Sequence, residues 1–319
     1  MEHTMALGRS GLQVPRLGVG AMTWGDPTGL ARWTPAKLAY GGAHGIEEEK
    51  RALETSIAAG VTLFDTAAMY SAGASERRLG ELTRGRDVVL ATKFPLSPFS
   101  RTDGLPQALD ASLARLERSV VDLYQHHFPS NRVSIPKLME LMADAVEAGK
   151  VKAIGVSNYS AEQMRLAHAA LARRGLPLAS NQVEYSLLHR QPEVNGVLDA
   201  CRELGVTLIA DMPLASGALT GKYLPGARPT GLRRFMPYFS RKGLAGITSV
   251  VALLREIGER YGKSPAQVAL RWLIENERVL PIPGAKNSQQ AAANAGALSF
   301  ALTAAEVEAL SQATLAWRA

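Results

Sequence analysis

Residues 62–70 read TLFDTAAMY, a short apolar run that ends in Asp65 and is followed five positions later by Tyr70. Runs of this β type recur along the chain and alternate with segments whose apolar residues have helical spacing. Near-continuous apolar strands that alternate with helices form parallel sheets covered by helices. The chain is therefore predicted to be an α/β protein with eight strands, at residues 17–20, 62–64, 88–91, 123–125, 153–156, 181–183, 206–209 and 279–282.

Two parallel α/β architectures are compatible with this alternation of strands and helices. Eight strands match a closed (β/α)₈ TIM barrel, and 319 residues suffice for one with extra elements. A doubly wound dinucleotide-binding sheet needs a glycine fingerprint after its first strand. Gly18-x-Gly20 is followed by Ala21-Met22-Thr23, so the third glycine of that fingerprint is missing. The pattern favours the barrel.

Elements outside the repeat are also marked by local chemistry. Residues 7–15, with Ser10-Gly11 at the turn, predict an N-terminal β-hairpin that closes the floor of the barrel. Residues 304–316 predict an extra C-terminal helix, and residues 1–319 are expected to form a single barrel domain.

Three helix starts carry a hydroxyl followed by Glu or Gln three positions later, the pattern of a capping box: Ser160 with Gln163, Ser264 with Gln267, and Thr303 with Glu306. Further helices are predicted at residues 47–58, 105–116, 135–148, 163–172 and 194–204.

Composition narrows the class of protein. The single cysteine, Cys201, allows no internal disulfide and suggests a reducing compartment. The N-terminus does not resemble a secretion signal and no run is long enough to cross a membrane, so a cytoplasmic protein is expected. The net charge of +7 is scattered, with one cluster from Arg228 to Lys242. A scattered excess is typical of a solvated face, which favours a small-molecule partner over nucleic acid or membrane.

Chemistry in a barrel lies at the carboxyl ends of the strands. Asp65 ends the second run, Lys93 the third, and His126-His127 the fourth, while Tyr70 follows Asp65. Taken singly, each residue could be a turn cap, loop packing, a surface charge or a satisfied core histidine. Neighbouring strands lie about 4.8 Å apart, so the ends of three successive strands can meet at one spot.

Together these side chains form a proton donor. A nearby ammonium favours a phenolate, so Lys93 is expected to lower the pKa of Tyr70. Asp65 would keep Lys93 charged and in position, and His127 would orient an oxygen near the phenol. Such a group suits protonation of a carbonyl oxygen while hydride reaches the carbon. Side chains do not donate hydride, so a nicotinamide cofactor is required; no metal is expected.

A family resemblance rests on motifs that run along nearly the whole chain. They begin with Leu7-Gly8-x-Ser10-Gly11-Leu12-x-Val14 and continue through Phe64-Asp65-Thr66-Ala67, Ala91-Thr92-Lys93-Phe94, Val121-Asp122-Leu123-Tyr124-Gln125-x-His127, Ile154-Gly155-Val156-Ser157-Asn158-Tyr159, Asn181-Gln182-Val183, Leu219-Thr220-Gly221-Lys222-Tyr223 and Ile282-Pro283-Gly284-Ala285-Lys286-Asn287. In these motifs the chain resembles the aldo-keto reductases, with the large-loop plant and bacterial reductases as the nearest subgroup. The resemblance implies a (β/α)₈ barrel, NADPH or NADP⁺ as cofactor (NADH being possible), and the catalytic tetrad Asp65, Tyr70, Lys93 and His127. The resemblance assigns the histidine of the tetrad to His127, whereas the side chain of His126 is expected to pack away from the site.

The same resemblance implies where the cofactor and substrate bind. Ser157, Asn158 and Gln182 would bind the nicotinamide carboxamide, residues 212–222 would run beside the pyrophosphate, and residues 284–294 would hold the 2′-phosphate and adenine. Independently, the loop entering a helix near Ser288 offers N–H groups to a phosphate, with Lys286 beside them. The implied cofactor residues are Gly20, Ala21, Met22, Asp65, Ser157, Asn158, Gln182, Asp211, Met212, Pro213, Leu214, Gly217, Lys222, Gly284, Ala285, Lys286, Ser288, Gln290 and Asn294; the implied substrate residues are Trp24, Tyr70, His127 and Phe128.

Two departures from the family pattern bear on how the cofactor binds. Asp211 stands where a tyrosine usually stacks on the nicotinamide. Its carboxylate either favours the positively charged oxidised nicotinamide or points elsewhere. Gln290 occupies a position often held by arginine, which weakens the expectation of strict NADPH use, since an amide does not grip a phosphate as a guanidinium does.

Two insertions lengthen the loops. Residues 223–246 combine basic and aromatic side chains and are expected to be either a lid over the cofactor or a surface loop. Residues 23–45 contain Trp24, Trp33 and Tyr40, which with Phe128 would wall an apolar substrate pocket.

The prediction is an NADP(H)-dependent oxidoreductase that reversibly reduces an aldehyde or ketone to an alcohol, with Tyr70 as the general acid. A nicotinamide-binding regulatory subunit with slow or no turnover is the alternative from another class. An aldolase that forms a Schiff base on Lys93 is a third reading. The physiological substrate, the preferred direction and the oligomeric state do not follow from the sequence, although a monomer fits the family.

Overall fold

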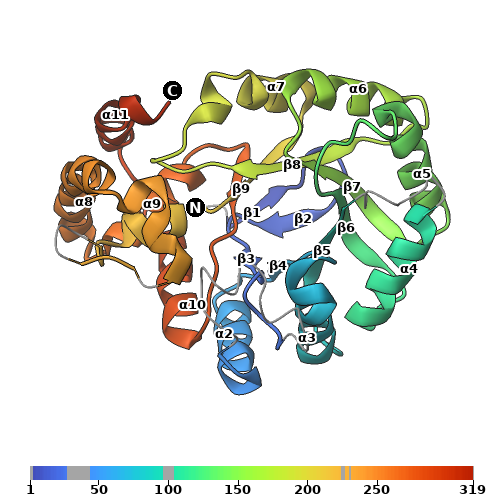
Figure 1. Ribbon diagram of the computed structural model, residues 1–319, viewed down its shortest axis with the longest axis horizontal. Coiled ribbons are helices and arrows are strands. Elements are labelled where there is room, and N and C mark those ends of the chain that lie inside the picture. Colours follow the sequence, from blue (N-terminus) through green and yellow to red (C-terminus); the bar gives the residue numbers. More distant parts are fainter. Residues whose placement is uncertain (1–2, 27–43, 96–103, 224–226, 230, 319) are drawn as a thin grey trace.

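The computed structural model describes residues 3–26, 44–95, 104–223, 227–229 and 231–318. All eight predicted apolar runs contribute to strands of one parallel sheet, which lies inside a ring of helices (Figure 1). The strands pair in chain order. They are β3 (Val19–Gly20), β4 (Leu63–Asp65), β5 (Val89–Phe94), β6 (Val121–His126), β7 (Val151–Ser157), β8 (Leu178–Glu184), β9 (Thr207–Asp211) and β10 (Val279–Pro281).

The first and last strands of the sheet also meet. The backbone N–H of Gly18 donates to Pro281 at 3.0 Å, and that of Gly20 donates to Pro283 at 3.1 Å. A parallel bridge joins Gly20 to Gly284. Close approach is needed here, because a Cβ on Gly20 would lie 2.9 Å from the Ile282 carbonyl oxygen. These contacts close the sheet and confirm the predicted (β/α)₈ barrel.

Helices surround the strands, and the three predicted capping boxes are all present, at Ser160, Ser264 and Thr303. The segment predicted at residues 194–204 begins as a helix only at Val197, after a short 3₁₀ turn. The helices are α2 (Ile46–Ala58), α3 (Ala74–Leu82), α4 (Gly104–Leu116), α5 (Ile135–Glu147), α6 (Ala161–Ala172), α7 (Val197–Leu204), α8 (Arg241–Tyr261), α9 (Pro265–Ile274), α10 (Ser288–Ala295) and α11 (Ala304–Ala313). The 3₁₀ turns are η2 (Tyr70–Gly73), η3 (Gln191–Glu193), η4 (Ala215–Thr220), η5 (Gly231–Phe235), η6 (Pro237–Phe239), η7 (Gly296–Leu298) and η8 (Leu315–Trp317).

The predicted N-terminal hairpin lies across one end of the barrel (Figure 1). Its strands β1 (Thr4–Ala6) and β2 (Gln13–Pro15) are antiparallel, and Leu7 and Val14 pack with apolar side chains of the barrel interior. The Gly8 N–H donates to Thr207 Oγ1 at 2.8 Å. Gly8 has a φ of +57°, and a Cβ there would lie 2.4 Å from the Ala179 carbonyl oxygen. The hairpin therefore closes the barrel floor, as predicted.

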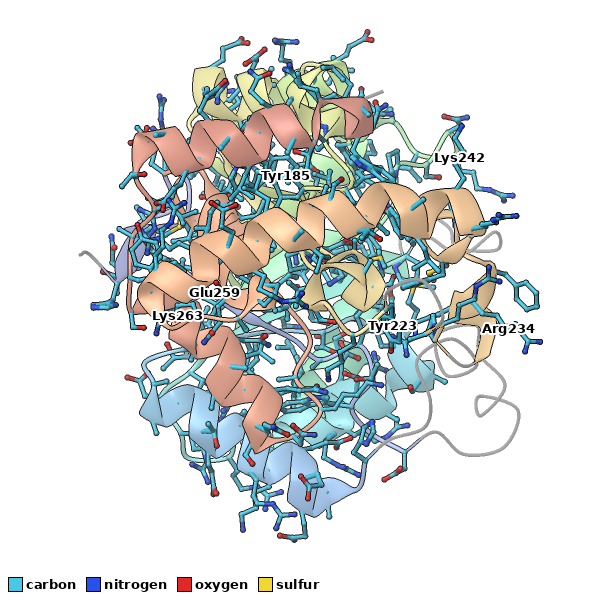
Figure 2. The ribbon with its side chains drawn as sticks, turned by 90° about the vertical axis from the view of Figure 1, so that its left-hand side faces the viewer. Tyr185, Tyr223, Arg234, Lys242, Glu259 and Lys263 are labelled. Carbon is cyan, nitrogen blue, oxygen red and sulfur yellow. The ribbon has the colours of Figure 1, made fainter. Side chains whose placement is uncertain are left out.

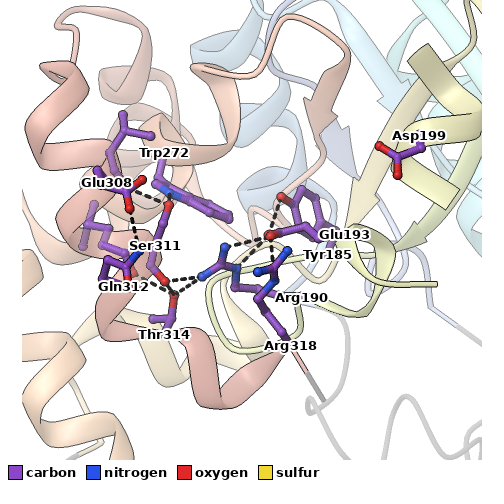
Figure 3. Close-up of polar contacts among 12 residues, drawn as sticks. Tyr185, Arg190, Glu193, Asp199, Trp272, Glu308, Ser311, Gln312, Thr314 and Arg318 are labelled. Atoms are coloured by element: carbon purple, nitrogen blue, oxygen red, sulfur yellow. Dashed lines mark hydrogen bonds and ion pairs between the residues drawn. The ribbon is translucent and has the colours of Figure 1, made fainter. Parts of the chain in front are cut away.

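A buried arginine anchors the C-terminal segment (Figure 3). Arg190 is 4% exposed and donates to Thr314 Oγ1 at 3.0 Å and to both carboxylate oxygens of Glu193 at 2.7 Å. Its backbone N–H donates to the Trp317 carbonyl at 2.9 Å, and the Trp272 indole donates to Ser311 at 3.1 Å. The bonds of Arg190 tie the end of α11 and η8 to the loop after β8, and the bond of Trp272 ties α11 to α9. Among the described residues, every helix is too short or too polar to cross a membrane.

We expect Arg190→Met to lower the free energy of unfolding by about 3 kcal/mol, because Glu193, whose side chain is only 12% exposed, would lose its main partner and keep Arg318 at 3.2 Å as its countercharge. Arg202→Met is the matched control: Arg202 pairs with Asp199, and these side chains are 54% and 71% exposed, so a change within about 0.5 kcal/mol is expected. Urea unfolding measures both variants. Equal effects in the two would contradict a special role of the Arg190 contacts.

Candidate active site

Polar side chains at the carboxyl ends of β4, β5, β6 and β8 meet inside the barrel. Lys93 forms an ion pair with Asp65 Oδ1. Asp65 Oδ2 accepts hydrogen bonds from Gln125 Nε2 at 3.1 Å and from Gln182 Nε2 at 3.0 Å. Lys93 is aligned with Gln125 across the β5–β6 pair, which explains why both side chains reach the same carboxylate. The structure therefore brings Asp65 and Lys93 together as the sequence predicts.

The lysine of this buried pair keeps its charge. Lys93 is 1% exposed and Asp65 2% exposed. Burial opposes the ammonium form, but the carboxylate of Asp65, supported by Tyr70 and Asp211, holds the pKa of Lys93 above its usual range. Two amide donors satisfy the second oxygen of Asp65, which offsets part of the cost of removing this charge from water.

Tyr70 lies beside the pair and faces the cavity. The Lys93 Nζ is 5.1 Å from the centroid of the Tyr70 ring. The chain turns sharply after the tyrosine, with Ser71 and Ala72 in left-handed conformations (φ 50° and 53°). Burial raises the pKa of Tyr70 to about 12, and Lys93 opposes that rise only in part. The predicted net lowering of this pKa is therefore wrong, because the cost of burying a phenolate exceeds the benefit of the ammonium.

The two histidines have different roles in the packing. His127 meets the Tyr70 ring edge-on, at 5.8 Å between centroids and 85° between planes. Its Nδ1 has no hydrogen-bond partner in the described part of the chain, and burial together with Lys93 lowers its pKa to about 3, so the ring is neutral. His126 Nδ1 instead bonds the Tyr159 hydroxyl at 2.8 Å. His126 thus packs, and His127 lies beside the tyrosine.

A cavity of about 660 Å³ begins at Tyr70 and extends to α10. Most of the residues that the sequence implied for the cofactor line it. They are Gly20, Met22, Asp65, Gln182, Asp211, Met212, Pro213, Leu214, Gly217, Lys222, Gly284, Lys286, Gln290 and Asn294.

Helix α10 forms the far end of the cavity. The Asn287 side chain caps the helix by accepting from the Gln290 N–H at 2.9 Å. Gln290 in turn accepts from the backbone N–H of Lys286 at 2.9 Å, and Asn294 donates to the Gly284 carbonyl at 3.1 Å. These bonds fix the loop before α10. They place the first N–H groups of the helix and the Lys286 side chain at one end of the cavity. Such an end attracts anions.

Several implied residues support the wall without lining the cavity. Ser157 donates to the Gln182 carbonyl at 2.9 Å, and the Asn158 side chain donates to the His127 carbonyl at 3.0 Å. Phe128 stacks on His127 at 4.3 Å and is 46% exposed. The remaining implied cofactor residues outside the cavity lining are Ala21, Ala285 and Ser288, and the implied substrate residues His127 and Trp24 also lie outside it.

Trp24 does not form the expected wall of a substrate pocket. Its side chain is fully buried in the core, packs against Phe64 at 6.2 Å, and donates to the Ala285 carbonyl at 2.7 Å. The apolar face of the indole fills the core next to the barrel, and its N–H satisfies a loop carbonyl. Trp33 and Tyr40, named with it, lie outside the described residues.

The insertion after β9 packs partly against the cavity. Arg233 lines it and donates to the Ser216 carbonyl at 3.1 Å and to the Tyr223 hydroxyl at 3.2 Å. The Tyr223 ring meets the fully buried Phe239 at 5.2 Å. Arg234 and Lys242 project from the surface (Figure 2). The end of the predicted insertion is the start of the long helix α8, and its function as a lid stays a prediction.

Three residues at the site were not predicted as site residues from the sequence. Gln125 braces Asp65; a signal for Gln125 was present, because an amide inside an otherwise apolar strand needs a partner. Ser264 and Ala266 line the cavity from the start of α9, and neither residue type points to a ligand in the sequence.

Known proteins resemble the chain over nearly its whole length. A model of the aldo/keto reductase family matches residues 16–314. An uncharacterized oxidoreductase of Mycobacterium bovis is 40% identical, covering 96% of this chain and 91% of its own length. The chloroplastic pyridoxal reductase of Arabidopsis thaliana is 35% identical, covering 92% of this chain and 81% of its own length.

A solved structure extends this similarity to three dimensions. The crystal structure of an aldo-keto reductase from Klebsiella pneumoniae in complex with NADPH has a TM-score of 0.73 and 26% identity, covering 98% of this chain and 95% of that one. The closed barrel, the buried Asp65–Lys93 pair beside Tyr70 and the family match lead to one assignment. The chain belongs to the aldo/keto reductase family of NAD(P)H-dependent oxidoreductases.

Proposed function

We propose that this protein catalyses the reversible, NADP(H)-dependent reduction of an aldehyde or ketone to an alcohol. The observation that carries the proposal is the Asp65–Lys93 ion pair beside Tyr70, at one end of a cavity that continues to α10. A proton donor at one end and an anion-attracting helix start at the other are what a carbonyl reductase with a phosphorylated cofactor needs.

The residues of the cavity fit a nicotinamide dinucleotide. Lys286 and the first N–H groups of α10 suit the 2′-phosphate. Gly217 lines the cavity with a φ of +93°, a conformation that favours glycine and lets a ligand approach the backbone closely. Gln182 and Asp211 line the end near Tyr70 and would contact the nicotinamide. We propose NADP(H) as the preferred cofactor, because Lys286 offers a positive charge to the 2′-phosphate. NAD(H) is the weaker but still usable cofactor, since Gln290 adds no second charge that would make binding depend on that phosphate.

The bound cofactor supplies hydride to the carbonyl carbon. Tyr70 donates its hydroxyl proton to the carbonyl oxygen, and the ammonium of Lys93 stabilises the phenolate that forms. Asp65 keeps that ammonium charged and oriented toward the ring. His127, which stays neutral, offers a hydrogen bond that aligns the carbonyl oxygen with the Tyr70 hydroxyl. In alcohol oxidation the phenolate takes the proton back.

Lys93 is a poor nucleophile in this setting. Schiff-base formation needs a free amine, but Lys93 is paired with Asp65, is 1% exposed, and has a pKa held above its usual range despite its burial. These features argue against an aldolase that forms a Schiff base on Lys93. They favour a lysine that acts through its charge.

The pH dependence of reduction follows from the same groups. Tyr70 has a pKa near 12, and His127 a pKa near 3. The general acid therefore keeps its proton across pH 6–9, and His127 does not change its charge there. We expect kcat/KM for carbonyl reduction at saturating NADPH not to fall by more than about threefold over this range. A tenfold fall between pH 7 and 9 would mean that the phenol titrates there.

A panel of aldehydes, ketones and alcohols, assayed with each of the four nicotinamide cofactors, tests the proposed function. The panel includes pyridoxal, the substrate named for the Arabidopsis relative. We expect steady oxidation of NADPH with at least one simple aldehyde. Tight NADPH binding with no turnover on any member of the panel would instead favour the nicotinamide-binding regulatory protein.

A further inference from the structure

Asp211 is an acidic residue in the cavity that the proposed mechanism does not use. It is the last residue of β9 and lines the cavity together with Asp65 and Tyr70. Its Oδ1 is buried and has no hydrogen-bond partner within the described residues. The next residue, Met212, has a left-handed φ of 46°, so the chain turns sharply directly after the carboxylate. A buried carboxylate oxygen without a partner suggests that a ligand supplies one.

The groups that face Asp211 do not neutralise it. Glu184, its register neighbour on β8, and Asp65 carry the same charge. The charge of Lys93 favours the ionised form of Asp211, but Lys93 is already paired with Asp65. Tyr70 is uncharged, and on the β10 side the neighbouring residues are Pro281 and Ile282.

This environment makes Asp211 titrate near neutral pH. Burial and the Glu184 carboxylate raise its pKa to about 7, while Lys93 opposes the rise. The carboxyl group is thus protonated below neutral pH and ionised above it. The ionised form has no full countercharge among the described side chains that face it, so a bound cation at this end of the cavity would stabilise it.

The proposed function fixes where a bound nicotinamide ring lies. Hydride transfer requires the ring to touch a carbonyl carbon whose oxygen is within hydrogen-bond reach of Tyr70. The ring therefore occupies the Tyr70 end of the cavity, which Asp211 lines. The oxidised ring carries one positive charge and the reduced ring none, so a carboxylate there distinguishes the two redox forms.

We propose that Asp211 is the residue that selects the oxidation state of the cofactor: its carboxylate serves as the countercharge of the oxidised nicotinamide. The affinity for NADP⁺ relative to NADPH then rises as Asp211 loses its proton, which biases the enzyme toward alcohol oxidation at alkaline pH. This inference rests on the proposed function, because it requires the nicotinamide to bind beside Tyr70.

Equilibrium binding of NADP⁺ and NADPH between pH 6 and 9 tests the proposal without turnover. The quantity compared is the ratio of the two dissociation constants, Kd(NADPH)/Kd(NADP⁺). Titration of the cofactor's 2′-phosphate affects both forms and cancels in this ratio. Tyr70 and His127 titrate outside the range. In the wild-type protein we expect the ratio to rise about tenfold, since each unit by which NADP⁺ lowers the pKa of Asp211 corresponds to a factor of ten.

Two variants assign the effect. Asp211→Asn keeps the shape of the side chain and removes its charge, so its ratio should be independent of pH and lower than the wild-type ratio at pH 9. Glu184→Gln removes one of the carboxylates that raise the pKa of Asp211; its ratio should still rise with pH, but with the midpoint at lower pH. This shift also serves as the test if Asp211→Asn fails to fold.

The outcomes separate the two proposals. A ratio that is flat in the wild-type protein, or that rises equally in Asp211→Asn, overturns the assignment of Asp211 while leaving carbonyl reduction intact. Failure to bind either NADPH or NADP⁺ overturns the proposed function, and the selection by Asp211 with it. An unshifted midpoint in Glu184→Gln also contradicts the proposal.

Discussion

Tyr70→Phe is expected to lower kcat for carbonyl reduction by about a thousandfold, the scale of a lost general acid, while Kd for NADPH changes by less than about threefold. The hydroxyl is the atom that gives up the proton, whereas the phenyl ring keeps its place against His127 and over Lys93. Steady-state kinetics with an aldehyde and NADPH titration by fluorescence measure the two quantities separately.

A second tyrosine in the same cavity provides the control. Tyr223 also lines the cavity, and its hydroxyl accepts from Arg233. Tyr223→Phe removes a hydroxyl of the same kind away from the Asp65–Lys93 pair, so kcat should stay within about threefold of the wild type. Wild-type rates in Tyr70→Phe would rule out Tyr70 as the acid. An equal loss in both variants would point to a general disturbance of the cavity.

Lys93→Met is expected to reduce both activity and stability. Without the ammonium, the phenolate of Tyr70 loses its stabilising charge, so kcat should fall by about a hundredfold or more. Asp65, 2% exposed, would keep a buried carboxylate without its countercharge, and the free energy of unfolding should fall by about 3–5 kcal/mol.

The double variant Asp65→Asn/Lys93→Met separates these two effects. Removing both charges relieves the uncompensated carboxylate, and the amide still bonds its neighbours. Most of the lost stability should therefore return, while activity stays low because Tyr70 has no ammonium beside it. Urea unfolding and kcat measure the pair of variants. Recovery of activity along with stability would mean that Lys93 has only a structural role.

The repeating elements of the fold could be predicted from short stretches of sequence. The capping boxes at Ser160, Ser264 and Thr303 formed as expected, because a hydroxyl and an amide or carboxylate three residues apart satisfy backbone groups within one turn. The eight apolar runs became strands, since each buries both faces. The start of α7 was predicted too early, because residues 194–196 follow the 3₁₀ turn η3 as a further turn, with Gly196 in a left-handed conformation (φ 82°), and the helix begins only at Val197.

The candidate site was predictable where topology alone brings residues together. Asp65 and Lys93 end neighbouring parallel strands, so a barrel places their side chains at the same rim. The hydrogen bond from Gln182 to Asp65 could not be predicted from the sequence, because 117 residues separate the two in the chain. The expectation that Trp24 lines a substrate pocket was wrong for a related reason. An aromatic residue in a loop suits a pocket wall and the core equally well, and the residues that pack around it decide between the two positions.

The sequence by itself determined the alternation of strands and helices, the caps, and the set of acid–base side chains at the strand ends, since these depend on residues a few positions apart. Only the tertiary structure decided the charge states. Tyr70 has a raised pKa although Lys93 lies beside it, and Asp211 faces Glu184 without a full countercharge. Burial and the sum of surrounding charges arise from segments far apart in the chain, and no local pattern encodes that sum.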